Sequence, residues 1–395
     1  MTRPIRVLCL DIEGGYGGSS RSLFETVRHM DRGAVAIEVW CKKDGPIRPR
    51  YEALGIPCRI VPDMPRVSAL PRLSRNLYTL AGFALSFLRS HRFRAALAAE
   101  IESRFDLVHF NHEALHMLMA WLRARTHAPF VMHVRTNLQP SIFARLQTRI
   151  MARSADRLVF ITEHEQNSFR RNGGMARRES VIANIVTPPE RVSPHPDVPA
   201  DSRFRVACLS NYSWVRGLDR LVDVAEKLKA LGRTDVLFVM AGTMALTRSM
   251  PGELGRLGAA KKTLADYAAL RGVADSFLFL GHVAEPERVL SACHALAKPS
   301  RENNPWGRDA LEGMAMGLPV LACGTYSKFV EDGVTGVLQP EFDADALARA
   351  IARMADDRAY ARRLGETGRA RVLTLCDGTA RATDLLAVWR EAARA

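Results

Sequence analysis

Residues 112–116 read His-Glu-Ala-Leu-His, a spacing that could bind zinc. On a helix, His112 and His116 would lie one turn apart on one face, and Glu113 beside them could activate a metal-bound water, as in zinc peptidases. Such a site also needs a third ligand. The helical pattern that follows offers no Glu, and His127 lies beyond it. We therefore expect no metal site here and attribute this spacing to chance.

A second chemical signal is the glycine-rich segment of residues 11–18, Asp-Ile-Glu-Gly-Gly-Tyr-Gly-Gly. It follows an apolar run and precedes a helical pattern that Ser19 or Ser20 could cap. Backbone N–H groups at such a junction can bind an anion, and Gly17 and Gly18 are the candidates. The spacing does not match the Gly-x-Gly-x-x-Gly pattern of dinucleotide-binding folds, and a simple turn is the alternative.

Two junctions in the second half of the chain combine polar side chains with the start of a helix. Arg216 stands just before Gly217, where an apolar strand pattern gives way to a helical one. A positive charge at the N-terminus of a helix is unfavourable because of the helix dipole, unless an anion binds there. The position of Arg216 therefore favours a site for a diphosphate. Further on, an apolar run that ends at Ser300 leads into a polar loop up to Gly307 and a helix expected at about residues 308–316.

His133 and Arg135 stand two residues apart at the end of an apolar run in the first half of the chain. Side chains two residues apart on a strand point to the same side, so both would face the same space. There they could take part in catalysis, with Arg135 directed at a phosphate group. A histidine packed in the core is the alternative for His133.

These candidate residues are separated by short apolar runs that alternate with longer amphipathic stretches, which is typical of parallel sheets with helices on both faces. The expected strands lie at residues 5–10, 36–41, 58–62, 106–110, 130–134, 157–161 and 180–184 in the first half, and at 205–210, 236–242, 277–281, 295–300, 319–324 and 336–340 in the second. The proline-rich residues 187–203 predict a linker. We expect an α/β protein with two doubly wound, Rossmann-like domains at residues 1–190 and 200–377, and a last helix at about 378–395 that packs back on the first domain.

The composition is that of a globular protein, with 47% apolar and 25% charged residues. No apolar run approaches the roughly 18 residues that span a bilayer, and the first residues do not resemble a cleavable secretory signal. The seven cysteines are scattered and never spaced as Cys-x-x-Cys, which is typical of reduced thiols. We therefore expect a cytoplasmic protein.

The net charge of +14 is unevenly distributed along the chain. Residues 1–200 contain 29 Lys and Arg against 18 Asp and Glu, and residues 64–99 contain six Arg, no acidic residue and an apolar run at 78–88. This segment could lie in a membrane interface with its arginines on anionic headgroups, or it could be an amphipathic helix packed on its own domain. The candidates for membrane contact are Arg72, Arg75, Arg89 and Arg92. No motif of nucleic-acid recognition is evident, so we expect no nucleic-acid partner.

Residues 295–324, ALAKPSRENNPWGRDALEGMAMGLPVLACG, resemble the donor-binding signature of retaining glycosyltransferases of the glycogen-synthase-like type (group 1, family 4). In that signature a Glu, seven residues and a second Glu precede a helix rich in small residues and then Gly-x-Pro-Val. Residues 205–221, 155–169 and 181–190 are similar to the family's phosphate-clamp segment, its serine-bearing strand and helix, and its exit from the first domain. The resemblance covers nearly the whole chain and implies the GT-B fold, in which two Rossmann-like domains face each other across a cleft.

Carried over residue by residue, the resemblance implies a set of donor contacts. Glu312 would accept hydrogen bonds from the ribose hydroxyls of the nucleotide, Asn304 would lie near the hydroxyls of the donor sugar, and Arg216 would contact the diphosphate. The candidate donor-binding residues are Gly17, Gly18, Asn211, Asn304, Gly307, Arg308 and Glu312, the candidate catalytic residues are Arg216, His133 and Arg135, and the acceptor-side candidates are His109 and His112.

Two positions depart from the family's pattern. Asn211 stands where the family has an arginine, so that one cation of the usual pair is missing or is supplied from elsewhere. Asn304 stands where the family has the first Glu, and an amide can donate a hydrogen bond as well as accept one. Glu302 is close enough in the sequence that, if the loop were shifted, it could contact the donor sugar in place of Asn304. These changes bear on the identity of the donor more than on the fold.

Together these features predict an enzyme, a retaining glycosyltransferase of the hexosyltransferase class that needs neither a metal ion nor a cofactor. Its donor would be a nucleotide sugar, a UDP- or GDP-sugar. The basic first domain would hold a glycan or lipid-linked hydroxyl acceptor in cell-envelope, lipopolysaccharide or exopolysaccharide assembly, with the protein peripheral to an anionic surface at the inner face of the plasma membrane. The alternatives are a nucleotide-sugar epimerase of the same fold and a non-catalytic carbohydrate-binding subunit.

Overall fold

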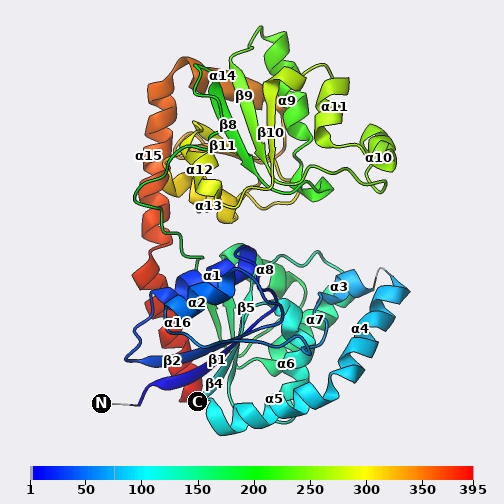
Figure 1. The fold of residues 1–395 in the computed structure, drawn as a ribbon, viewed down its shortest axis with the longest axis vertical. Helices are drawn as coiled ribbons and strands as arrows, with labels where there is room; N and C mark the ends of the chain where they lie inside the picture. The colour runs from blue at the N-terminus through cyan, green and yellow to red at the C-terminus, as the bar shows by residue number, and fades with distance from the viewer. Residues whose placement is uncertain (1–2, 75, 395) are drawn as a thin grey trace. The chain divides into compact units, whose positions relative to one another are not determined.

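The computed structural model describes residues 3–74 and 76–394, which divide into two compact units. Unit 1 is formed by Met1–Ile185 and Cys376–Ala395, and unit 2 by Val186–Leu375. Each unit has one parallel sheet with helices on both faces (Figure 1). The expected α/β class with two doubly wound sheets is therefore confirmed. No helix among the described residues has the length and apolar character needed to cross a membrane.

In the described part of unit 1, seven parallel strands form a sheet in the order β3-β2-β1-β4-β5-β6-β7. These strands are β1 (Ile5–Asp11), β2 (Val35–Cys41), β3 (Cys58–Ile60), β4 (Leu107–Phe110), β5 (Phe130–Val134), β6 (Arg157–Phe160) and β7 (Glu179–Val181). The helices are α1 (Gly18–Arg28), α2 (Ile47–Ala53), α3 (Leu70–Leu73), α4 (Leu77–Arg89), α5 (His91–Arg104), the 3-10 turn η1 (Glu113–Leu115), α6 (His116–Arg123), α7 (Ile142–Ser154), α8 (Glu163–Arg171) and α16 (Gly378–Ala393). All seven expected strands of the first half are present.

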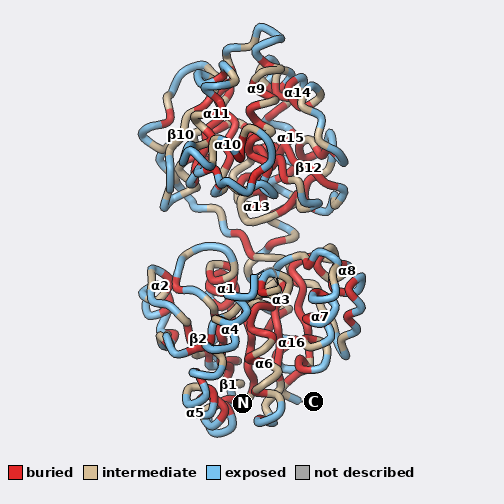
Figure 2. Tube along the Cα trace, turned by 90° about the vertical axis from the view of Figure 1, so that its right-hand side faces the viewer, coloured by how far each residue is buried: buried red, intermediate tan, exposed pale blue. Residues whose placement is uncertain are grey.

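The strands of unit 1 supply side chains to two cores, because successive residues of a strand point to opposite faces of the sheet. Val7 and Cys9 of β1 point into the core beneath α1, α2 and α16. Leu8 and Leu10 point into the core beneath α5, α6, α7 and α8. Figure 2 shows the strands as buried segments between helices whose outer faces are exposed.

The last helix, α16, completes the first of these cores. Trp389 on α16 is fully buried, and its indole Nε1 donates a hydrogen bond to Nδ1 of His109 on β4 at 3.2 Å. The two rings pack edge to face with centroids 5.4 Å apart. Residues more than 250 positions apart in the sequence therefore share one core.

In unit 2, six parallel strands form a sheet in the order β10-β9-β8-β11-β12-β13. They are β8 (Phe204–Leu209), β9 (Val236–Ala241), β10 (Phe277–Gly281), β11 (Ala295–Lys298), β12 (Val320–Cys323) and β13 (Gly336–Gln339). The helical segments are η2 (Trp214–Arg216), α9 (Arg220–Ala230), α10 (Gly252–Ala259), α11 (Leu264–Leu270), η3 (Ala274–Ser276), α12 (Pro286–Ser291), α13 (Arg308–Ala315), α14 (Ala344–Asp356) and α15 (Arg358–Leu375). All six expected strands of the second half are present. The main core lies beneath α9, α11, α14 and α15, and α12 and α13 pack on the other face.

Two helices begin elsewhere than the sequence indicates. Helix α1 begins at Gly18, after an extended Gly17, and no side chain caps it. Both serines that were expected to cap it lie inside the helix instead. Helix α9 begins at Arg220 rather than near Gly217, because Trp214–Arg216 form a separate 3-10 turn that Gly217 ends in a left-handed conformation.

Replacement of Trp389 by Ala is expected to lower the free energy of unfolding of unit 1 by about 3–5 kcal/mol, because it leaves a cavity and removes the donor to His109. The matched control is Arg390→Ala, an exposed neighbour on the same helix. Urea unfolding followed by far-ultraviolet circular dichroism measures both variants. Equal stability of the two variants would contradict the position of α16 in this core.

Candidate functional site

Polar side chains at the carboxyl ends of the unit 1 strands form one hydrogen-bonded network. Asn111, after β4, donates through Nδ2 to the carboxylate of Asp11 at the end of β1 and to the carbonyl oxygen of Ser19 in α1, both at 3.1 Å. Arg135, after β5, donates through Nη2 to Oδ1 of Asn111 at 2.6 Å and through Nη1 to Oδ1 of Asn184 at 3.0 Å. The network thus connects the ends of three strands, the residues after β7 and the start of α1.

The network holds one buried acid and one fixed cation. Burial raises the pKa of Asp11, and hydrogen bonds from Asn111 and from the backbone N–H of Ile12 oppose that rise. Three nitrogen atoms of the Arg135 guanidinium donate to neutral oxygen atoms of Asn111 and Asn184. These amide oxygens orient the guanidinium, and the positive charge of Arg135 also opposes the rise in the pKa of Asp11.

The His-Glu-Ala-Leu-His segment connects two loops at the same edge. Glu113 is buried, and its carboxylate accepts hydrogen bonds from the backbone N–H of Arg135 at 2.9 Å and from the hydroxyl of Thr136. The loop after β5 is thereby fixed to the loop after β4. Glu113 has a structural role that its spacing in the sequence did not reveal.

The two histidines of this segment do not converge. His112 precedes η1 as its cap, and its Nδ1 accepts from the N–H of Ala114 at 3.0 Å. His116 is fully buried with Nδ1 bonded to the carbonyl oxygen of Glu113, and burial lowers its pKa to about 4. Among residues 3–74 and 76–394, no three His, Cys, Asp or Glu side chains gather in a way that could hold a metal ion.

His109 and His133 lie in the core of unit 1, so two expectations need correction. Their exposed fractions are 0% and 4%, and their rings meet edge to face with centroids 5.5 Å apart. Strand alternation directs His109 and His133 toward the face that α16 covers, so both rings are packed inside unit 1. His133 is therefore not placed for catalysis, and His109 is not placed to meet an acceptor.

The start of α1 and His112 are among the accessible groups at this edge. Cβ atoms built at Gly17 and Gly18 would meet nothing within 4 Å, so the backbone there faces open space. His112 is partly exposed at the end of β4. Of the expected membrane contacts, Arg72, Arg89 and Arg92 are exposed, and Arg75 lies outside the described residues.

In unit 2, the loops after β8 and β11 are bound tightly to each other. Oγ of Ser300 and the backbone N–H of Arg301 both donate to the carbonyl oxygen of Val215, at 3.1 and 2.9 Å. The Arg301 guanidinium lies 3.4 Å from the centroid of the Trp214 ring and pairs with the buried Asp219, with Nη1 to Oδ1 at 2.8 Å. Together these contacts hold the η2 turn in one conformation.

The η2 turn carries Arg216 at an exposed position. Gly217, which ends the turn, has φ +68°, and a Cβ there would come 2.1 Å from the carbonyl oxygen of Pro299. Only glycine permits both the backbone conformation and the close approach. The Arg216 guanidinium has no hydrogen-bond or ion-pair partner within the described part of the chain.

A second cation, Lys298, ends β11 and was not singled out in the sequence. It is buried, and its Nζ donates to both carboxylate oxygens of Asp309 at 2.9 and 2.8 Å. A Cβ at Gly307 would lie 2.6 Å from Asp309 Oδ1 and 3.0 Å from Lys298 Nζ. Burial raises the pKa of Cys208 to about 12, and Lys298 and Arg216 oppose that rise, so both cations lie near the end of β8.

The other expected donor-binding residues of unit 2 differ in what they contact. Oδ1 of Asn304 is buried and accepts no hydrogen bond from any described residue. The Glu312 carboxylate is bound by Arg308 one turn earlier on α13, with Nη2 to Oε1 at 2.9 Å. Asn211 accepts from the backbone N–H of Thr243 at 2.9 Å, which connects the loops after β8 and β9. Asn304 therefore offers an unused acceptor, whereas the side chain of Asn211 connects loops.

Several of these residues escaped sequence reasoning, namely Asp11, Asn111, Lys298 and Arg301. Each stands at the end of an expected strand or within a few residues of it, which was the available signal. Their partners are distant in sequence, so the pairings could not be read from spacing.

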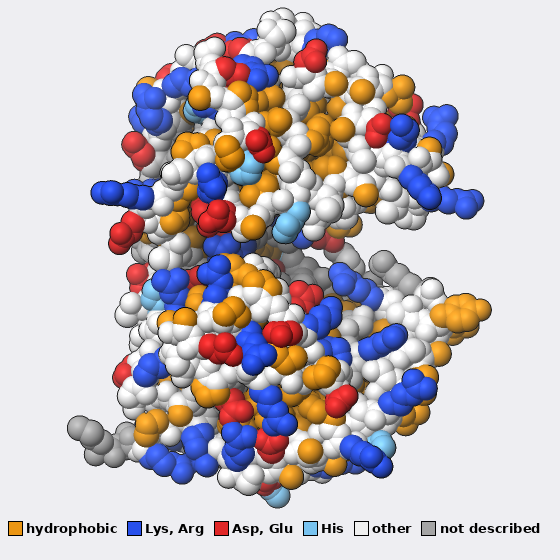
Figure 3. Space-filling view, in the orientation of Figure 1, with side chains coloured by type: hydrophobic (Ala, Val, Ile, Leu, Met, Phe, Trp, Pro, Cys, Tyr) orange, Lys and Arg blue, Asp and Glu red, His pale blue; other side chains and the backbone are white. Residues whose placement is uncertain are grey.

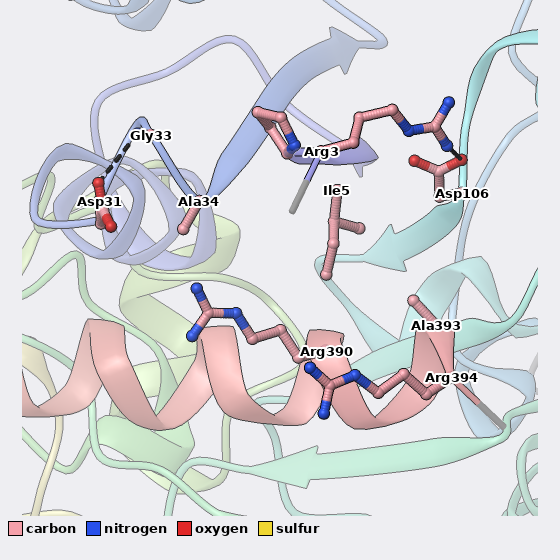
Figure 4. Close-up of a pocket in the computed structure, with 10 residues that line it drawn as sticks. Arg3, Ile5, Asp31, Gly33, Ala34, Asp106, Arg390, Ala393 and Arg394 are labelled. Atoms are coloured by element: carbon pink, nitrogen blue, oxygen red, sulfur yellow. Dashed lines mark hydrogen bonds and ion pairs between the residues drawn. The ribbon is translucent and has the colours of Figure 1, made fainter. Parts of the chain in front are cut away.

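A hollow of about 560 Å³ lies at the opposite, amino edge of the unit 1 sheet. Figure 4 shows Arg390 of α16 and Arg394, just after this helix, on one side of it and Asp31 on the other. Ligands of doubly wound sheets bind at the carboxyl ends of strands, so we assign no substrate to this hollow.

Comparisons with known families match the two units of the chain separately. Residues 17–185 match the sequence model of the "Glycosyl transferase 4-like domain", and residues 195–371 match that of the "Glycosyl transferases group 1". The chain belongs to the group 1 glycosyltransferase family, and the protein is a glycosyltransferase.

Individual relatives are similar over most of the chain. D-inositol 3-phosphate glycosyltransferase from Saccharomonospora viridis is 28% identical over 372 residues, which cover 86% of this chain and 81% of the relative. The crystal structure of HepE (Alr3699) from Anabaena in complex with UDP has a TM-score of 0.75 and 20% identity, covering 98% of this chain and 100% of the other. Sucrose-phosphate synthase from Thermosynechococcus elongatus has a TM-score of 0.71 and 21% identity, covering 98% of both chains. The two structures share the GT-B fold with this chain.

Replacement of Arg301 by Ala is expected to lower the free energy of unfolding of unit 2 by about 3–5 kcal/mol, because it leaves the buried Asp219 without its cation. The double variant Arg301→Ala, Asp219→Asn should recover part of the loss, since no buried charge is then unpaired. Guanidinium unfolding measures both, with Arg362→Ala on the outer face of α15 as the control. A double variant less stable than the single one would contradict the argument.

The stability of unit 1 is expected to fall as the pH decreases below about 6.5. Burial lowers the pKa of His109 to about 3 and that of His116 to about 4, whereas an unfolded histidine titrates near pH 6.5. Between these values the unfolded chain binds more protons, so each buried histidine costs up to about 1.4 kcal/mol of stability per pH unit. Urea midpoints at pH 7.5 and 5.5 measure the effect.

The matched variants for this pH effect are His116→Gln and His91→Gln. The first removes a buried histidine and should reduce the loss of stability between the two pH values, and the second removes an exposed one and should not. An unchanged pH dependence in His116→Gln would show that its ring is not held neutral by burial.

Proposed function

We propose that the protein transfers a hexosyl group from a nucleotide sugar to a hydroxyl acceptor, with retention of anomeric configuration. The observation that supports this most directly is the loop cluster at the carboxyl edge of the unit 2 sheet. It presents an exposed Arg216 on a fixed turn, and Oδ1 of Asn304, which is buried in the same loop cluster, accepts no hydrogen bond from any described residue. A diphosphate and a sugar hydroxyl are the groups that such a cluster fits.

The chemistry needs positive charge more than it needs a nucleophile. Breaking a glycosyl–phosphate bond builds negative charge on the departing diphosphate, and fixed cations lower that barrier. Arg216 would contact the diphosphate, whereas Lys298 is paired with Asp309 and would hold the start of α13 in place beside it. Attack on the same face as the leaving phosphate would account for retention without a covalent intermediate.

The remaining residues of unit 2 would bind the rest of the donor. Asn304 would accept a hydrogen bond from a sugar hydroxyl, which satisfies its unpaired oxygen. The Glu312 carboxylate, oriented by Arg308, would accept from the ribose hydroxyls. A UDP-sugar is the first choice, because the similar Anabaena protein has been solved with UDP and with UDP-glucose, and a GDP-sugar is the second.

The acceptor would be held by unit 1, where His112 is accessible, and the open backbone at Gly17 and Gly18 would contact the diphosphate of the donor. We propose a glycan or lipid-linked acceptor of cell-envelope or exopolysaccharide assembly, met at the cytoplasmic face of a membrane. The acid-free segment at residues 64–99 supports membrane contact, with Arg72, Arg89 and Arg92 exposed on it.

The test of this function is calorimetric titration with UDP-, GDP-, ADP- and dTDP-sugars, with and without a chelator. One nucleotide class is expected to bind, and the chelator is expected to leave its affinity unchanged. Arg216→Ala should weaken binding about tenfold to a hundredfold, because it removes one charge-assisted hydrogen bond. The control variant Arg362→Ala should leave the affinity unchanged.

Other outcomes would replace the proposal. Binding of no nucleotide would indicate a non-catalytic carbohydrate-binding protein. Conversion of one nucleotide sugar into its epimer without an acceptor, followed by nuclear magnetic resonance, would indicate an epimerase. Inversion of configuration in the isolated product would overturn the proposed stereochemistry alone.

A further inference from the structure

Helix α4 turns its apolar side chains toward the solvent instead of toward the core. Of its 13 residues only Phe83 is buried. Leu77 and Tyr78 are 81% and 89% exposed, and Leu80, Leu85 and Leu88 are exposed as well. Their spacing puts these residues on one face of the helix, since residues three, four, seven and eight positions apart lie on one side. A surface helix of a globular protein normally has the opposite arrangement.

Helix α7 extends this exposed apolar surface. Ile142, Phe143 and Leu146 in its first two turns are exposed, Ile142 at 76%. Helix α3 packs against both α4 and α7, and the backbone N–H of Leu70 in α3 donates to Oε1 of Gln147 in α7 at 2.8 Å. We call the exposed apolar residues of the two helices the α4–α7 face, which consists of Leu77, Tyr78, Leu80, Leu85, Leu88, Ile142, Phe143 and Leu146.

The charges around the α4–α7 face have one sign. Residues 64–99 and 114–155, which include both helices, contain no Asp or Glu. Six exposed arginines lie on or beside these helices, and none forms a salt bridge with a described residue: Arg72, Arg89, Arg92, Arg145, Arg149 and Arg153. Figure 3 shows hydrophobic side chains projecting at the outer edge of unit 1, with Lys and Arg side chains beside them.

We infer that the α4–α7 face lies in the interface of an anionic lipid bilayer, with its apolar side chains among the acyl chains and its arginines on the headgroups. Apolar residues rimmed by cations, with a tyrosine at the edge, fit the layered chemistry of a bilayer surface. At 13 residues α4 is too short to cross, so it would lie along the surface. The inference rests on the proposed function, because a lipid-linked acceptor would be met at such a surface.

The charge argues against a second copy of the chain as the occupant of this face. In a twofold dimer each patch meets the same patch, so arginines would face arginines without a counter-charge. Anionic headgroups supply that counter-charge for every arginine. A bilayer can also accept the convex, widely exposed side chains of α4 without a matching pocket.

The test is co-sedimentation of the full chain with phosphatidylcholine vesicles that contain or lack phosphatidylglycerol. Binding should be at least tenfold stronger to the anionic vesicles. The variant Leu77→Ser, Tyr78→Ser, Leu88→Ser should lose at least tenfold in binding, and Arg72→Gln, Arg89→Gln, Arg92→Gln should lose the preference for anionic lipid, at about fivefold per arginine. The matched control is Met175→Ser, Leu231→Ser, Leu270→Ser, whose residues are exposed but lie elsewhere, and it should bind as the wild type does.

The result is distinguishable from a failure of the proposed function, because nucleotide-sugar titration of the same variants reports on the donor site and not on the α4–α7 face. Binding of vesicles without any nucleotide binding would support the lipid face and refute the proposed donor. Absence of vesicle binding, or equal binding by the serine variant and the wild type, would overturn the inference. So would a dimer, detected by light scattering, that the serine variant abolishes.

Discussion

The close approach of Gly217 to the carbonyl oxygen of Pro299 is the constraint on which the arrangement of the unit 2 loops depends. Parallel strands all end at one edge of their sheet, where each loop leaves the ladder and loses its hydrogen-bonding neighbours. At that edge the loop after β8 would be mobile if nothing held it. Gly217 brings it within reach of the loop after β11, and Ser300 and Arg301 then bind the backbone of η2. The exposed guanidinium of Arg216 is thus carried on a turn that cannot move freely.

The two units hold the loops at their strand ends in place with different kinds of interaction. In unit 1 the strand ends are connected mainly through amides, since Asn111 and Asn184 orient Arg135 without cancelling its charge. In unit 2 the ties are ion pairs, Arg301 with Asp219 and Lys298 with Asp309. Ion pairs position the loop but neutralise the cations that form them. The charge available to a ligand in unit 2 therefore comes first from Arg216.

A surface of different character lies on the helices of unit 1. Most of its helices bury an apolar face and expose a polar one, as α1 does. In α4 the arrangement is reversed, and the surrounding segments contain only positive charge. Exposure of this much apolar surface to water is unfavourable in free energy. Such surfaces typically mark places where a protein or membrane partner binds. The proposed donor site and the proposed membrane contact thus lie on separate parts of the chain.

The sequence by itself determined the fold class, the thirteen strands and the family. Strand periodicity and the Pro–Gly punctuation between elements are local, so they can be read from neighbouring residues. Arg216 could be singled out as a candidate locally, because it stands between an expected strand and the start of a helix, and Asn304 was singled out by the resemblance to the family.

Only the tertiary structure decided which of the candidate side chains are accessible. His133 ends a strand and would be exposed if the sheet were bare, but α16 returns from the end of the chain and covers it. The His-Glu-Ala-Leu-His spacing has a chemical meaning only on one continuous helix, and a 3-10 turn divides it here. The ion pairs of Lys298 and Arg301 and the exposure of the apolar side chains of α4 depend on which segments pack against them. Burial is a property of contacts between distant segments, and no local pattern contains it.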